Sequence, residues 1–168
     1  MQFPPTSISL RIATAEDNAF MQMVYAGTRA DEMALVDWND EQKSAFLQMQ
    51  FEAQRTSYLR ESPNAQYSVI LSDGVPAGRL IVDRTDDTVH VIDIALLPAY
   101  RNFGIGKSVL LGLQDEAREA NKAVRLHVEN FNRAYQLYER LGFKKVAEAG
   151  FHWRMEWKAE AADVAQVA

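Results

Sequence analysis

The sequence predicts an α+β fold, in which a mixed β-sheet carries helices on both of its faces. Strand-like and helix-like segments alternate along the chain in the order β-α-α-β-β-β-α-β-α-β. The last segment, residues 151–158, alternates apolar with polar residues, as a half-buried strand does. The 168 residues suffice for one sizeable core and are too few for two. We therefore expect a single domain over residues 1–158 and a loose, alanine-rich tail over residues 159–168.

The first part of the chain is predicted to form one strand and two helices. The strand covers residues 8–13, and Thr14 follows as the N-cap of a helix with acidic residues in its first turn. The helical spacing of apolar residues predicts an inward face made of Phe20, Met23, Val24 and Gly27. A second helix begins near Asn39, because Gln42 stands at the reciprocal position of a capping box. Its apolar stripe consists of Leu47, Phe51 and Tyr58.

A hairpin is predicted in the middle of the chain. Residues 67–72 and 77–84 have strand character, and Asp73-Gly74 between them is a strong hairpin signal. Residues 88–97 form a third strand after a polar turn. This part of the sheet should be largely antiparallel.

The second half is predicted to add a parallel strand. A helix over residues 105–121 connects the strand at 88–97 with a strand at 124–129. A helical crossover of this length joins parallel neighbours. The inward face of this helix should consist of Val109, Leu110, Leu113 and Ala117. A short helix over residues 133–141, which Gly142 ends, leads to the last strand.

Composition excludes several kinds of site. The chain has no Cys, so it holds no disulfide, thiolate nucleophile or cysteine–metal site. The three His stand in separate segments without the close pairs typical of zinc sites, and we expect no metal. A net charge of −5 argues against non-specific nucleic-acid binding, which needs a basic face. Since no export signal and no apolar stretch of membrane-spanning length is present, we expect a cytoplasmic protein that binds no membrane.

A glycine-bearing turn stands between the strand at 88–97 and the helix at 105–121. It reads Arg101-Asn-Phe-Gly104-Ile-Gly106-Lys107-Ser108. Before a helix N-terminus, such a turn presents backbone N–H groups and partial positive charge, and glycine lets the backbone approach a phosphate. The turn therefore predicts a phosphate site to which Arg101 and Lys107 add charge. The alternative is a tight connection between strand and helix, in which the glycines only allow the backbone conformation of the turn and bind no phosphate.

Gly106-Lys107-Ser108 also matches the end of a nucleotide-binding P-loop, G-x-x-x-x-G-K-[ST]. The first glycine of that motif would fall at Arg101, and no second strand ends in a clear magnesium-binding Asp. A P-loop-like nucleotide-binding enzyme therefore remains an alternative, although this sequence lacks part of the P-loop motif.

A second motif reads Asn132-Arg-Ala-Tyr-Gln-Leu-Tyr138-Glu-Arg-Leu-Gly-Phe143. Together with Asp93-Ile-Ala-Leu-Leu-Pro98 and the glycine turn, it resembles the GNAT superfamily of N-acetyltransferases in order, spacing and intervening helix. The resemblance covers the element order from Leu10 to Lys158, and it is specific in its motifs from Asp93 to Phe143.

The resemblance implies acetyl-CoA as co-substrate and a cleft that holds it. In such folds the two parallel strands splay apart, and the pantetheine arm pairs with the free strand backbone in the gap. Here the gap would lie between residues 94–97 and 127–129, and the pyrophosphate on residues 101–107. Asn132 would contact the pantetheine or cap its helix. The implied cofactor contacts are Ile94, Ala95, Leu96, Leu97, Arg101, Asn102, Phe103, Gly104, Ile105, Gly106, Lys107, Ser108, Asn132 and Tyr138.

The implied reaction is direct attack of a primary amine, on a small molecule or a peptide, on the thioester. It needs a proton acceptor for the amine and a proton donor for the departing thiolate. Tyr138 aligns with the tyrosine that often acts as general acid in relatives, although a buried helix aromatic is its other interpretation. His127 and His90 are candidate bases, because His titrates near neutral pH. Asp93 and Glu129 are further candidates.

The resemblance also implies that the first two helices and their connection line the acceptor site. Asp31, Glu32 and Trp38 there suit a cationic amine through charge pairing and cation–π contact. In the alternative interpretation, the acidic residues are solvent-exposed helix caps and the Trp only anchors the connection. The alternative to an enzyme is an acyl-CoA-binding sensor or interaction module without turnover. A homodimer is left open.

Overall fold

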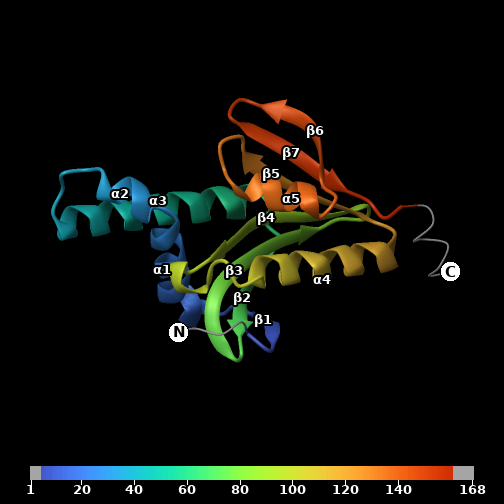
Figure 1. Cartoon of the computed structure of the whole chain (residues 1–168). Coiled ribbons are helices and arrows are strands. Elements are labelled where there is room, and N and C mark those ends of the chain that lie inside the picture. Colours follow the sequence, from blue (N-terminus) through green and yellow to red (C-terminus); the bar gives the residue numbers. More distant parts are fainter. Residues whose placement is uncertain (1–4, 161–168) are drawn as a thin grey trace. The chain divides into compact units, whose positions relative to one another are not determined.

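The computed structural model describes residues 5–160 (Figure 1). The predicted tail therefore lies outside the described residues from position 161 onward. The elements, with η1 and η2 as short 3-10 turns, are β1 (Ile8–Ile12), η1 (Ala15–Asp17), α1 (Asn18–Thr28), α2 (Ala30–Ala34), α3 (Asp40–Glu61), β2 (Gln66–Ser72), β3 (Val75–Arg84), β4 (Thr88–Leu96), η2 (Pro98–Tyr100), α4 (Ile105–Ala120), β5 (Ala123–Glu129), α5 (Ala134–Arg140), β6 (Lys144–Ala149) and β7 (His152–Trp157).

The strands form one mixed sheet of seven strands in the order β1-β2-β3-β4-β5-β7-β6, which confirms the predicted α+β class. β1 is antiparallel to β2, and β7 is antiparallel to both β5 and β6. β4 and β5 are parallel, with Thr88 opposite Ala123 and Val91 opposite Leu126. The crossover through a helix thus produces the parallel pair predicted from the sequence.

The predicted hairpin between β2 and β3 is present. Its two turn residues, Asp73 and Gly74, have φ angles of 49° and 82°, as a two-residue turn with both central residues in the left-handed region requires. The Asp73 carboxylate also accepts hydrogen bonds from the backbone N–H groups of Thr6 and Ser7, at 3.1 and 2.8 Å. Hydrogen bonds to this turn therefore also hold the residues that precede β1.

The chain divides into two compact units. The first contains Met1–Ile81 and Asp93–Ile105, and the second contains Val82–Ile92 and Gly106–Ala168. Among the described residues, no helix combines the length and the apolar character needed to cross a membrane.

The core of the first unit is formed where α1 and α3 pack against β2. Met21, Tyr25, Phe51 and Val69 form one buried cluster, and the rings of Tyr25 and Phe51 are 6.0 Å apart. α3 begins at the predicted capping box. Asn39 Oδ1 accepts from the Gln42 N–H at 2.8 Å, and Gln42 Oε1 accepts from the Asn39 N–H at 3.0 Å.

The core of the second unit lies around α4 and β5. All four residues predicted to face inward from α4 are buried, and β5 buries alternate residues as a half-buried strand does. The side chain of Gln114 on α4 is also buried, and it donates from Nε2 to the Leu141 carbonyl at 2.9 Å. This bond links α4 to the end of α5.

Several details differ from the sequence predictions. Met23 was predicted to face inward but is 57% exposed, because α1 turns Met21 and Tyr25 toward Phe51 of α3 instead. α2 is a short helix where only a connection was expected. β6 was not predicted as a strand, because its sequence KKVAEA is mostly exposed and has no apolar alternation. Phe151, predicted as a buried strand residue, precedes β7 and is 74% exposed.

Candidate active site

The turn between β4 and α4 leads directly into the N-terminus of a helix. Asn102 and Gly104 have φ angles of 67° and 80°, and α4 begins directly after them at Ile105. A Cβ built on Gly104 or on Gly106 would meet no neighbouring atom of the described chain within 4 Å. The start of α4 therefore presents open glycine backbone, the property that close approach of a phosphate needs.

Arg101 anchors this turn. Its Nε donates to the Leu96 carbonyl and its Nη2 to the Gly27 carbonyl, both at 3.2 Å. α1 approaches closely here, since a Cβ on Gly27 would lie 3.0 Å from Pro98 Cδ. The observed contacts of Arg101 are thus structural, within the first unit. Its contact with a phosphate stays a prediction.

Residues 94–97, expected to face the pantetheine, pack against a glycine that the sequence analysis missed. A Cβ on Gly78 would overlap the carbonyl oxygen of Ala95 and crowd the Leu96 side chain. Next to it, the Leu97 N–H donates to the Ala77 carbonyl at 2.8 Å. Gly78 therefore allows β3 to approach the end of β4. An isolated glycine inside a strand pattern was the available signal.

A buried ion pair fixes Asp93, one of the further base candidates. The Arg79 side chain, 4% exposed, contacts the Asp93 carboxylate through Nη2 and donates to Gln54 Oε1 at 2.9 Å. Burial raises the pKa of Asp93 above its usual range, and the Arg79 charge acts in the opposite direction. The Arg79 guanidinium also lies over the Tyr25 ring, 5.8 Å from its centroid. Sequence analysis missed Arg79, because one basic residue in an apolar strand carries no motif.

In the second unit, the two candidate base histidines lie together. His90 Nε2 is 3.4 Å from His127 Nδ1, and their rings meet edge to face with centroids 5.4 Å apart. Burial lowers the pKa of both His90 and His127, and neighbouring positive groups, Arg125 among them, lower it further. Both imidazoles are therefore neutral at neutral pH and able to accept a proton. Over residues 5–160, no group of three or more acidic or His side chains is arranged to hold a metal ion.

Glu129, the other further candidate, stands at the end of β5. Its pairing partner on β7 is His152, whose Nε2 lies 3.9 Å from Glu129 Oε1. Both side chains are about half exposed, so the contact is a loose surface pair.

Asn132 and Tyr138 are placed by α5. Asn132 Oδ1 accepts from the Ala134 N–H at 2.9 Å, one residue before Arg133, which holds the N-cap position of α5. Tyr138 is 9% exposed and packs edge-on against Phe143, with ring centroids 5.9 Å apart. The Phe143 N–H donates to the Tyr138 carbonyl at 3.0 Å, which folds the end of the motif back onto α5.

The expected acceptor residues lie on α2 and on the chain before α3. Glu32 pairs with Arg29 at 2.8 Å, and Arg29 Nε also donates to the Tyr25 hydroxyl at 3.3 Å. Trp38 is 41% exposed and packs edge-on against Phe46 at 5.3 Å. The Glu32 charge is thus partly neutralised, whereas Trp38 is held at the surface by its neighbour.

Comparisons with known proteins agree with this geometry. Residues 31–143 match the model of the acetyltransferase (GNAT) family. No curated protein matches the sequence. Similar solved structures include the PaiA N-acetyltransferase from Thermoplasma acidophilum in complex with coenzyme A, with a TM-score of 0.69, 18% identity, and coverage of 92% of this chain and 100% of that one. An acetyltransferase from Thermus thermophilus has a TM-score of 0.66 and 14% identity, and the match covers 94% of this chain and 100% of that one.

A third similar structure is Ard1 from Thermoplasma volcanium. Its TM-score is 0.60 at 18% identity, with coverage of 91% of this chain and 98% of that one. At these sequence identities the solved structures show a shared fold only. The family model matches the sequence itself, over the residues that contain the glycine turn and the second motif. This chain belongs to the GNAT acetyltransferase family.

Proposed function

We propose that this protein transfers an acetyl group from acetyl-CoA to a primary amine by direct attack on the thioester. The observation that carries the proposal is the open glycine backbone at Gly104 and Gly106, at the start of α4 in a chain of this family. The similar PaiA structure contains coenzyme A, which supports the same cofactor here.

The cofactor contacts that we propose follow one another along the chain. The backbone of residues 94–97 pairs with the pantetheine, and the pyrophosphate binds residues 101–107. The side chain of Lys107 adds positive charge beside the N–H groups. Asn132, whose Oδ1 accepts from the Ala134 N–H, contacts the pantetheine.

In the reaction, the amine nitrogen attacks the thioester carbonyl, a C–N bond forms and the C–S bond breaks. The departing thiolate takes a proton from the Tyr138 hydroxyl, and the amine loses one to His127 or His90. The lowered pKa of these two imidazoles supports this role, because it keeps them unprotonated at neutral pH. For the acceptor, we propose that Asp31, Glu32 and Trp38 attract a cationic amine.

The test is an acceptor screen with acetyl-CoA. Polyamines, free amino acids and peptides with an N-terminal or lysine amine are each incubated with the protein, and free CoA thiol and product mass are recorded. Thiol release that depends on the amine, with an acetylated product, is expected. Stabilisation by acetyl-CoA without release across the whole panel would instead indicate a binding module. Stabilisation by Mg-ATP and none by acetyl-CoA would indicate a nucleotide-binding enzyme.

A further inference from the structure

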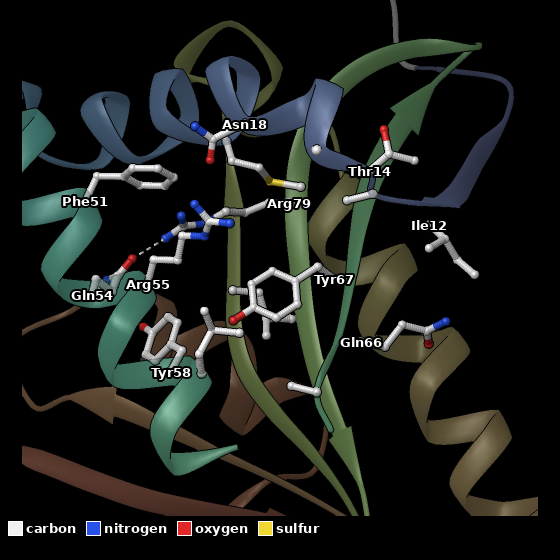
Figure 2. A pocket seen from close by; sticks show the side chains of 16 residues that line it. Ile12, Thr14, Asn18, Phe51, Gln54, Arg55, Tyr58, Gln66, Tyr67 and Arg79 are labelled. Atoms are coloured by element: carbon white, nitrogen blue, oxygen red, sulfur yellow. Dashed lines mark hydrogen bonds between the residues drawn. The ribbon is translucent and has the colours of Figure 1, made fainter. Parts of the chain in front are cut away.

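The first unit contains a cavity that the proposed transfer reaction does not use. It has a volume of about 690 Å³, within the range of small-molecule pockets. It lies between α1, α3 and the strands β1 to β3, and Figure 2 shows Tyr58 and Tyr67 turned toward it from α3 and β2. Much of its wall is apolar or aromatic, including Met21, Phe51 and Ile81.

The charged groups of this wall are all basic. Its sixteen lining residues, all in the described chain, include Arg55 and Arg79 and no Asp or Glu. Outside the wall, Asp93 neutralises Arg79. Arg55 has no comparable partner, since its Nη1 lies 4.0 Å from Glu52 Oε2 and both side chains are about half exposed. The cavity therefore keeps a net positive charge that a ligand anion would balance.

Two polar atoms of the wall are buried without a hydrogen-bond partner. They are the hydroxyl of Tyr67 and Nε of Arg79, whose side chain is only 4% exposed. Buried polar groups are rarely left unpaired, because desolvation without a partner is costly. Arg Nε only donates, and a phenol hydroxyl can also donate. An acceptor such as a carboxylate oxygen would satisfy both, although Oδ2 of Asp93, which contacts Arg79, is a third buried atom without a hydrogen-bond partner.

We propose that this cavity binds a small organic acid, whose apolar or aromatic body lies between Phe51 and the two tyrosine rings. Its carboxylate accepts hydrogen bonds from Tyr67 and Arg79 and pairs with Arg55. Because Arg55 is half exposed on the surface of α3, its side chain can turn onto the carboxylate as the ligand enters. Binding at this site does not depend on acetyl-CoA.

The test compares three compounds of one shape, naphthylacetate, naphthylacetamide and naphthylethylamine, by calorimetric titration of the protein without acetyl-CoA. The acid should bind at least about tenfold more tightly than the amide, and the amine more weakly than both. In Arg55→Gln the preference of acid over amide should disappear. Arg60→Gln, which removes a charge from the same helix outside the cavity wall, should leave all three affinities unchanged.

Tyr67→Phe provides an independent readout. Without ligand this variant should unfold about 2–4 °C higher, because an unpartnered buried hydroxyl is removed, yet it should bind the acid about tenfold more weakly. Equal affinity for acid, amide and amine, no binding of any of them, or a lower melting temperature with unchanged affinity would each overturn the proposal. None of these results depends on acetyl transfer, so failure here is distinct from failure of the proposed function.

Discussion

Tyr138 combines a packing role with the proposed transfer of a proton. Its ring is buried against Phe143, which Tyr138→Phe preserves while it removes only the hydroxyl. If the hydroxyl protonates the departing thiolate, turnover should fall by about 10²- to 10⁴-fold with little change in acetyl-CoA affinity. Steady-state kinetics with a saturating acceptor measure this effect.

The matched control for that experiment is Tyr135→Phe, the same substitution on the same helix. Tyr135 packs edge-on against Trp153 at 4.6 Å. It is outside the proposed machinery and should keep the parent rate. A rate for Tyr138→Phe within about threefold of the parent would remove Tyr138 from the mechanism and leave its packing as its function.

At the scale of elements, the approach of β3 to the end of β4 depends on Gly78. In Gly78→Ala the new methyl group would overlap the Ala95 carbonyl, so the free energy of unfolding should fall by about 1–3 kcal/mol. Gly112→Ala is the control, because a methyl group there meets open space on α4 and should stabilise the helix by up to about 1 kcal/mol. Urea unfolding measures the free energy of unfolding of both variants. Equal changes in the two would show that the close approach of β3 to β4 does not depend on Gly78.

Elements with strong local patterns could be predicted from the sequence. The parallel pair β4–β5 follows from the length of the crossover, and the hairpin from Asp73-Gly74. β6 could not be predicted, because an exposed strand has no buried face to impose alternation.

For the candidate site, local sequence predicted the glycine turn and placed His90 and His127 on neighbouring strands, where the structure brings them into contact. The Arg79–Asp93 pair and the cavity beside it were missed. Contacts of this kind join residues from different strands and helices, so no local pattern in the sequence predicts them.

At the scale of the whole molecule, stability should depend on the two paired histidines. Burial lowers the pKa of both His90 and His127, so the folded state binds fewer protons than the unfolded chain near pH 6. Their contribution is present above the unfolded pKa of about 6.5 and is lost as the pH falls through the lower folded values. The free energy of unfolding should therefore decline from about pH 7 to pH 5.

The double variant His90→Gln with His127→Gln should flatten part of this decline. Chemical unfolding of parent and variant at a series of pH values measures it, with pH 8 as the reference at which both imidazoles are neutral in either state. Parallel curves for the two proteins over the whole range would show that the pair does not couple protonation to folding.

The Gly106→Val variant tests whether acetyl-CoA binds with its pyrophosphate on the glycine turn. Gly106 and Gly112 both lie on α4, and a Cβ on either meets only open space, so helix propensity predicts no loss of stability from valine at either position. Calorimetric titration with acetyl-CoA should show a loss of at least about tenfold in affinity for Gly106→Val and parent affinity for Gly112→Val. Equal acetyl-CoA affinities in the two folded variants would show that the pyrophosphate does not bind at Gly106.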